Sequence, residues 1–448
     1  MRLLIENATV VTINGQDDVL EPGWVEVVDG VITAVSGAPL DAAGADRRID
    51  ASGKVVMPGI INAHTHLFQT LIRGVYEHLP FNEWLRCIYN CGRALTAEDC
   101  EIGARLGALE ALHTGVTTLM DHQFLNRGLE LPQATIAGMQ ALGVRSVLAR
   151  VIMDLGDLAP SEVIETPEAG LRSVESLLDS YQGQLGDGML TLMTGPNTPG
   201  LSASGELSQA TARFAAERGL RVSAHLAESA SAVEAVEQRY GKRGVITWLD
   251  ELDAIGPNLI AAHCVHLSPE EVSIMARRGA SVAHNPVSNM FLGDGIAPIV
   301  EMLEAGVNVA LGTDGAASNN SQDMFQTIKF ASLLQRARLQ DSHAVSPRRT
   351  LRMATINGAH ALGLDHLVGS IEVDKRADLI VVDLLGSPHN VAVHNVVSHL
   401  VHNAQSSDVE LVMVDGQVVM EDRKVLGVDE AGLLREAQTA ARRLVTRL

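Results

Sequence analysis

The feature of this chain that most limits its fold is a regular alternation of short apolar segments with amphipathic ones. The amphipathic stretches are helix-like. The helix expected at 206–218 would end at Gly219. In the helix expected at 268–279, Ser268 and Glu271 have the spacing of a capping box. Eight strand–helix units over about 270 residues predict an α/β fold, a (β/α)8 TIM barrel. The strand-like segments lie at 55–66, 115–122, 145–154, 189–197, 220–228, 258–267, 280–289 and 308–315.

The two ends of the chain have a different pattern of apolar and polar residues. LLIENATVVTI, GWVEVVDG and VITAVSG near the start, and ADLIVVDL and VELVMVDG near the end, alternate apolar and polar residues between Gly and Asp turns. We therefore expect a small β-sandwich domain built from both chain ends, at 1–56 and 368–428. It would flank a barrel at 57–367, and residues 429–448 would form a C-terminal helix with apolar residues at helical spacing.

The overall charge and the apolar runs narrow the choice of partner. With 34 basic and 54 acidic residues, the 448-residue chain carries a formal charge of −20, which disfavours nucleic-acid binding. We find no apolar run of the roughly 18 residues that a membrane span needs, and no basic, apolar leader at the start. Four cysteines are too few for a disulfide scaffold. These features predict a cytoplasmic protein that binds neither nucleic acid nor a membrane.

Histidines and acids stand where the predicted strands end. In a TIM barrel the C-terminal ends of all strands open on one face, which is where active sites form. Each residue taken alone is more often structural, so the argument rests on their convergence. The residues at these strand ends are His64 and His66, Asp121 and His122, His225 followed by Glu228, His263, His284, and Asp314.

The spacing of His64 and His66 favours a metal site. Residues i and i+2 of a strand point to the same side, so two imidazoles would project together into the barrel. Neutral imidazole with a carboxylate suits zinc, iron or manganese. Three histidines, an aspartate and a position left for water are typical of a hydrolytic centre, where the cation lowers the pKa of its water toward about 7.

Five segments together give the chain a family resemblance. PGIINAHTH, AHLAES, AAHCVHL, VAHNPVSNM and LGTDGAASNN resemble the amidohydrolase superfamily, in this order and over nearly the whole chain. More narrowly they resemble its deaminase and s-triazine hydrolase branch, which includes S-adenosylhomocysteine and methylthioadenosine deaminases. The motifs are specific for the superfamily and much less so for the substrate.

The resemblance implies a role for each matching residue. His64, His66, His225 and Asp314 would hold one divalent metal ion, zinc before iron or manganese. Members with two metals usually bridge them with a modified lysine of the fourth strand, and 189–197 contains none. Glu228 would shuttle protons, and His263 would polarise the metal-bound water or the substrate ring.

These parts predict a hydrolytic deaminase of a nitrogen heterocycle. Water activated by the metal and Asp314 would attack an amino-bearing ring carbon. Glu228 would act as base and then as acid, and His263 would stabilise the developing charge. Two alternatives stay open. An s-triazine hydrolase would displace chloride or an alkylamine by the same attack, and a non-catalytic scaffold would keep only the fold.

The segment after the first strand is expected to cover the mouth of the barrel and to recognise the substrate. In nucleoside-deaminating relatives an acid at the place of Glu83 holds ribose hydroxyls, whereas Asn197 replaces a histidine that they tend to carry. Trp84 offers a face for stacking on a planar ring. Gln69 and Gln123 are further candidates for reading ring heteroatoms. Barrels of this kind often pair, so we also expect a homo-oligomer.

Overall fold

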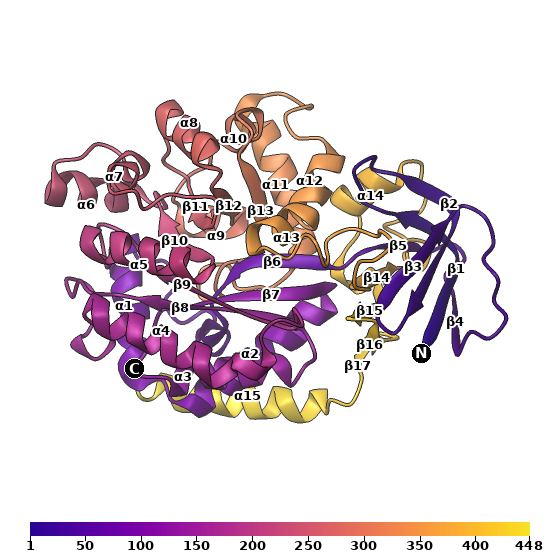
Figure 1. Cartoon of the computed structure of the whole chain (residues 1–448), viewed down its shortest axis with the longest axis horizontal. Coiled ribbons are helices and arrows are strands. Elements are labelled where there is room, and N and C mark those ends of the chain that lie inside the picture. The colour runs from indigo at the N-terminus through magenta and orange to yellow at the C-terminus, as the bar shows by residue number, and fades with distance from the viewer.

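Eight parallel strands form the larger part of the molecule. The computed structural model describes residues 1–448, and Figure 1 shows these strands with helices packed around them. Neighbours in the sheet follow chain order from β6 to β13, and the N–H of Asp314 donates to the carbonyl of His64 (2.9 Å), which joins the last strand to the first. The predicted TIM barrel is confirmed. Its strands are β6 (Ile60–Thr65), β7 (Val116–Gln123), β8 (Arg145–Ile152), β9 (Leu190–Pro196), β10 (Val222–Leu226), β11 (Leu259–His263), β12 (Ser281–His284) and β13 (Asn308–Leu311).

The helices begin and end at the signals that the sequence carries. Ser268 and Glu271 form a reciprocal capping box at the start of α8, and Gly219 ends α5 in the left-handed conformation (φ 66°), both as predicted. The helices before β10 are η1 (Leu67–Ile72), α1 (Phe81–Ala94), α2 (Ala97–His113), α3 (Glu130–Gln140), η2 (Ser161–Val163), α4 (Pro167–Tyr181), η3 (Gln182–Gln184) and α5 (Gly205–Arg218). Those after it are α6 (Ala230–Tyr240), α7 (Val245–Glu251), α8 (Pro269–Arg278), α9 (Pro286–Leu292), α10 (Ile299–Glu304), α11 (Met324–Leu339), α12 (Pro347–Met353) and α13 (Ile356–Leu362).

Strands from both chain ends form a second, smaller sheet, at the right of Figure 1. The predicted β domain built from the two ends is therefore confirmed, and its strands form one mixed sheet of nine in the order β17-β16-β15-β14-β5-β1-β2-β3, with β4 beside β1. The strands are β1 (Arg2–Val11), β2 (Val19–Val28), β3 (Val31–Ser36), β4 (Arg47–Asp50), β5 (Val55–Pro58), β14 (Leu379–Val382), β15 (Val409–Val414), β16 (Gln417–Glu421) and β17 (Lys424–Val425).

The first apolar run, 55–66, divides between the two sheets. Val55–Pro58 pairs with β14 in the smaller sheet, and Ile60–Thr65 is the first barrel strand. Gly59 lies at the crossing, where a Cβ atom would stand 2.2 Å from the side chain of Thr117. A close backbone approach of this kind leaves no signal in the periodicity of the run, which reads as a single strand.

A buried ion pair attaches the smaller sheet to the barrel. The fully buried guanidinium of Arg145, at the start of β8, donates to both carboxylate oxygens of Asp378 (2.9 and 2.8 Å) and to the carbonyl of Gly188 (2.7 Å). It also reaches Asp415 (3.3 Å), which follows β15. Because β8 begins at the N-terminal end of the barrel, these contacts lie opposite the mouth.

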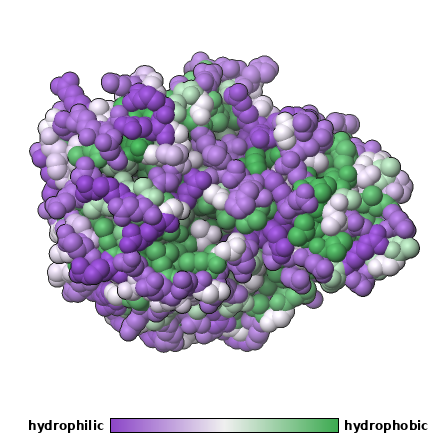
Figure 2. Space-filling model, in the orientation of Figure 1, coloured by the Kyte–Doolittle hydropathy of each residue, from purple (hydrophilic) through white to green (hydrophobic).

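Two further helices complete the fold. α14 (Val396–His402), with η4 (Ser406–Asp408) after it, packs against α11 and α12. The predicted C-terminal helix is α15 (Glu430–Val445), which packs against α2 and η1. No helix has the length and apolar character to cross a membrane. Figure 2 shows a mostly hydrophilic face with separate apolar patches, one of them over the smaller sheet.

Candidate active site

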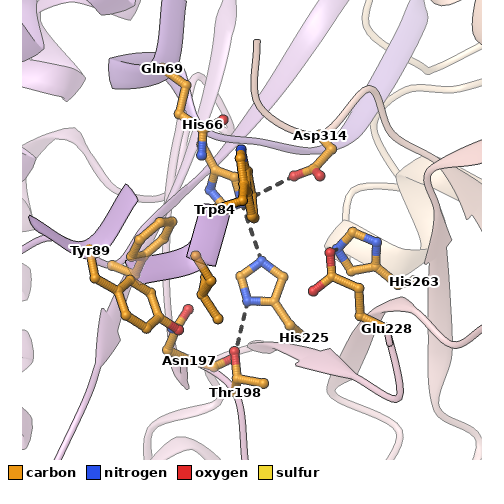
Figure 3. Close-up of a pocket in the computed structure, with 12 residues that line it drawn as sticks. His66, Gln69, Trp84, Tyr89, Asn197, Thr198, His225, Glu228, His263 and Asp314 are labelled. Atoms are coloured by element: carbon orange, nitrogen blue, oxygen red, sulfur yellow. Dashed lines mark hydrogen bonds and ion pairs between the residues drawn. The ribbon is translucent and has the colours of Figure 1, made fainter. Parts of the chain in front are cut away.

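The barrel gathers the four predicted metal ligands at its mouth. His64 and His66 come from the end of β6, His225 from β10, and Asp314 from the turn after β13. The Nε2 atoms of His66 and His225 are 3.2 Å apart, and Oδ1 of Asp314 is 3.1 Å from Nε2 of His66 and 3.5 Å from Nε2 of His64. Figure 3 shows this convergence of His66, His225 and Asp314. Ligand atoms from strands far apart in the sequence therefore meet within a few ångströms.

Backbone carbonyls fix the protonation of two of these rings. Nδ1–H of His66 donates to the carbonyl of His122 (2.8 Å), and Nδ1–H of His225 donates to the carbonyl of Asn197 (3.2 Å). Burial lowers the pKa of His225 well below its usual value, so that ring is neutral. A neutral imidazole with its proton on Nδ1 has a lone pair on Nε2. The two Nε2 atoms thus face each other with lone pairs, an arrangement that a cation between them would stabilise.

The carboxylate of Asp314 is oriented in the same way. The hydroxyls of Ser288 and Ser318 donate to its Oδ2 (2.6 and 2.8 Å), which leaves Oδ1 toward the histidines. His64 has no hydrogen-bond partner at either ring nitrogen although it is fully buried. Buried polar atoms without partners are costly in a folded protein. The donor set of three imidazoles and one carboxylate fits a divalent metal ion that takes nitrogen and oxygen ligands.

Backbone strain helps these side chains to enter the mouth. His263 and Asp314 have φ values of 72° and 61°, and Ala227, the residue before Glu228, has 49°. Residues other than glycine rarely adopt this left-handed region, and such residues cluster at functional sites. The strand ends therefore turn sharply where the site is built.

Glu228 and His263 form the second half of the site. Oε1 of Glu228 is 3.5 Å from Nε2 of His263, and both side chains are buried. Burial, and then the charges of Asp294 and Asp314, raise the pKa of Glu228 well above its usual value. Burial lowers the pKa of His263 to about 3, so its ring is neutral. In Figure 3 these two side chains lie beside His225, on the side away from Tyr89 and Asn197.

His66, His225 and Asp314 border a pocket that is partly open to solvent and holds about 300 Å³ of space not filled by atoms. Trp84, Leu85 and Tyr89 reach it from α1, and Phe124 from the end of β7. The indole N–H of Trp84 donates to the carbonyl of Ala317 (3.3 Å), so its ring can offer only its faces and edges to a ligand. The lining is His66, Gln69, Trp84, Leu85, Tyr89, Phe124, Asn197, Thr198, His225, Glu228, His263 and Asp314. A flat, partly polar molecule matches such walls.

Asn197 lines the cavity, but its side chain is held by protein groups. Its Nδ2 donates to the hydroxyls of Tyr89 (2.8 Å) and Ser202 (3.0 Å), and its Oδ1 accepts from Nε2–H of His122 (3.2 Å). Nδ1 of His122 in turn accepts from the hydroxyl of Ser223 (2.9 Å). Both nitrogens of His122 are therefore engaged, which leaves this histidine no lone pair for a metal although it lies beside His225.

Glu83, Gln123 and His284, which the sequence also singled out, lie outside the cavity lining. Glu83 is exposed in the first turn of α1. Gln123 is buried at the end of β7 and donates to the carbonyl of Leu125 (3.3 Å). His284 is buried without hydrogen-bond partners at either ring nitrogen, and burial lowers its pKa to about 3.

Sequence reasoning missed several residues that support the site. The sequence marked His122 only as a histidine at a strand end. Its position beside His225 depends on how β7 and β10 are placed in the barrel. Ser288, Ser318 and Asn289 lie on segments after strands and have no spacing that marks them. Their contacts with Asp314 and His263 arise only from the fold.

Comparison with known proteins agrees with this architecture. The model of the amidohydrolase family matches residues 55–419, which is most of the chain. This protein belongs to the amidohydrolase family. It is 39% identical to a 5'-deoxyadenosine deaminase of Methanosarcina acetivorans over 446 residues, 99% of each chain.

Solved structures of family members show the same fold. The structure of an adenosine deaminase of Xanthomonas campestris with bound zinc has a TM-score of 0.91 and 32% identity, over 99% of this chain and 98% of that one. An atrazine chlorohydrolase of Arthrobacter aurescens, complexed with zinc, has a TM-score of 0.92 and 28% identity, over 98% and 100%. The predicted resemblance to the branch that holds deaminases and triazine hydrolases is confirmed, and the His and Asp cluster of this chain is a metal-binding one.

Proposed function

We propose that this amidohydrolase is a zinc-dependent deaminase that removes the amino group from the adenine ring of a nucleoside altered at its 5' position. The observation that carries the hydrolytic reaction is the facing pair of ring-nitrogen lone pairs, on His66 and His225, beside Oδ1 of Asp314. The substrate class rests on the 39% identity to a 5'-deoxyadenosine deaminase over nearly the whole chain. Zinc is proposed over iron or manganese because the related structures contain it.

His64, His66, His225 and Asp314 would hold the cation. When bound, a divalent cation of this kind activates water for attack at neutral pH. Glu228 is placed to take a proton from the attacking water and to return it to a ring nitrogen. Burial raises the pKa of its carboxyl group, which favours the protonated form that later donates the proton. His263 stabilises the negative charge that develops during the attack.

Recognition is proposed to come from α1 and the cavity walls. Trp84 would cover one face of the adenine ring, and Gln69 would read a ring heteroatom. Glu83 would bind ribose hydroxyls from the rim. Asn197 would contact the substrate only across the part of its surface that its protein partners leave open.

A panel of substrates tests this proposal. The zinc-loaded protein is offered 5'-deoxyadenosine, methylthioadenosine, S-adenosylhomocysteine and adenosine, with free adenine and a chlorinated s-triazine as alternatives. We expect ammonia release from the 5'-altered nucleosides with the highest kcat/KM. Chloride release from the triazine without ammonia release from any nucleoside would favour the alternative leaving group. Turnover of none of them, with zinc bound, would favour a scaffold.

We further propose that the protein acts in the cytoplasm as a homo-oligomer. Its four cysteines, Cys87, Cys91, Cys100 and Cys264, are all free thiols, which is usual in a reducing compartment. Light scattering after size-exclusion chromatography measures the mass of the particle against the 47.7 kDa of one chain. A mass of one chain at micromolar concentration would contradict the proposed assembly.

A further inference from the structure

Two polar residues, one within α9 and one just after it, lie near the ring of His263 on its Nδ1 side. Asn289 belongs to the helix, and Asp294 follows Gly293, which ends the helix in the left-handed conformation (φ 74°). Both are buried, at 1% and 8% exposure. Neither lines the cavity or belongs to the metal ligands, and Asp294 has so far entered only through its charge, which raises the pKa of Glu228.

The contacts of His263 define where its ring carries a proton. An imidazole ring with a single ring proton has a hydrogen on one nitrogen and a lone pair on the other. Nδ2 of Asn289 lies 2.9 Å from Nδ1 of His263, and Nδ2 of Asn285 lies 3.5 Å from the same atom. An amide nitrogen can only donate, so Nδ1 must be the acceptor. The proton of His263 is therefore on Nε2, the atom that faces Glu228.

Asp294 explains why Asn289 presents its amide nitrogen and not its oxygen. The same Nδ2 lies 3.4 Å from Oδ2 of Asp294, and this is the side-chain hydrogen bond that Asp294 makes. With the amide reversed, its oxygen would face both a carboxylate oxygen and an imidazole nitrogen. The amide oxygen and the carboxylate oxygen of Asp294 would then be two facing acceptors, so the reversed amide is unfavourable whichever tautomer the ring adopts. The carboxyl group thus fixes the amide, and the amide fixes the ring.

We propose that Asn289 and Asp294 are positioning residues that keep the proton of His263 on Nε2. The ring then presents an N–H donor to the reacting atoms and has no lone pair there for the metal. This separates His263 from His66 and His225, whose carbonyl partners place the proton on Nδ1 and the lone pair on Nε2. Opposite tautomers thus give histidines at one mouth different tasks, as ligands or as donor. The catalytic consequence rests on the proposed deaminase function.

The kinetics of three variants test whether Asp294 orients Asn289 and Asn289 orients His263. Asn289→Leu keeps a similar volume and removes the donor, and we expect kcat to fall about 10–100-fold with KM within about twofold, as for other residues that orient a ligand or catalytic group. Asp294→Asn should cost less, because either end of the new amide can face Asn289. If Asp294 acts only through Asn289, the double variant loses no more than Asn289→Leu alone. Additive losses would overturn that dependence.

The ring tautomer provides a readout that does not depend on activity. Nitrogen-15 spectra of the zinc-loaded protein, with the His263 signals identified by their absence in His263→Gln, should show Nε2–H as the single form. Asn289→Leu should add the Nδ1–H form, while the signals of His66 and His225 and the zinc content stay as in the wild type. A wild-type ring protonated on Nδ1, or an unchanged tautomer and kcat in Asn289→Leu, would overturn the proposal.

Two further measurements cover the cases in which Asn289→Leu does not fold or the protein is not a deaminase. If Asn289→Leu does not fold or bind zinc, Asp294→Asn is judged by the same spectrum, and an unchanged spectrum with unchanged kcat overturns the role of Asp294. Wild-type protein that deaminates no nucleoside would contradict the proposed function. The tautomer would still be read from the ring signals, so the two failures are distinguishable.

Discussion

The two ends of the barrel differ in whether their buried polar groups have hydrogen-bond or ion-pair partners within the protein. At the end opposite the mouth, which we call the closed end, the guanidinium of Arg145 contacts the carboxylates of Asp378 and Asp415 and the carbonyl of Gly188. At the mouth, the Nε2 atoms of His66 and His225 face each other, and His64 has no hydrogen-bond partner. Arg145 and Asp378 at one end and the three histidines at the other are all buried, so the difference lies in whether the chain itself supplies hydrogen-bond partners for the groups that it buries.

This contrast separates stability from function. A satisfied buried ion pair is costly to break, because the remaining partner keeps its charge without compensation. An unsatisfied cluster weakens the fold until a ligand completes it, and the free energy of binding then adds to stability. Substitutions at the closed end should therefore change unfolding, whereas substitutions at the mouth should change metal content and turnover.

The largest effect is expected from removing a ligand. His225→Leu should lose zinc and all measurable turnover, because three of the four proposed donors hold a metal poorly. In the presence of a chelator, however, its free energy of unfolding should exceed that of wild type by about 1 kcal/mol, since one of two facing lone pairs is gone. Urea denaturation with and without zinc measures both. A metal-free variant less stable than metal-free wild type would contradict the contrast.

Glu228→Gln should have the next largest effect. The amide cannot exchange protons, so kcat should fall by about 10²–10⁴-fold while zinc remains bound. Glu271→Gln is a matched control, because Glu271 is also buried but accepts from the backbone N–H groups of Ile246 and Ser268. The control should lose stability and keep kcat. Near-normal turnover in Glu228→Gln would remove Glu228 from the proton path.

The sequence predicted the mouth better than the closed end, and there is a physical reason. Strand-end position and residue type are local properties, so His66, His225 and Asp314 could be placed on one face from the pattern alone. Arg145 is also at a strand end, but its partner Asp378 is 233 residues away in the other sheet, and nothing local marks the pair. Asn289 escaped prediction similarly, since its role depends on the amide orientation that Asp294 imposes.

Arg145→Ala tests the closed end. It leaves Asp378 buried without its cation, so the free energy of unfolding should fall by about 3–5 kcal/mol. Zinc content and kcat at low temperature should stay close to wild type, because the mouth is at the other end of β8. Arg376→Ala is the control, since Arg376 pairs with Asp415 from a partly exposed position and should cost about 1 kcal/mol or less. A loss of zinc in Arg145→Ala that precedes unfolding would show that the two ends are coupled.

The smallest effect is expected at the rim, where Glu83 is exposed and belongs neither to the metal cluster nor to the closed end. Glu83→Gln should leave zinc content, kcat and stability unchanged. If Glu83 binds ribose hydroxyls, replacing a charged acceptor by a neutral one should raise KM for nucleosides by about tenfold, which corresponds to 1.4 kcal/mol, a typical loss for a hydrogen bond to a charged group. KM for free adenine, which has no ribose, should not change. An equal rise in KM for adenine and its nucleoside would place the effect of Glu83 on the helix α1 that carries Trp84, and not on the sugar.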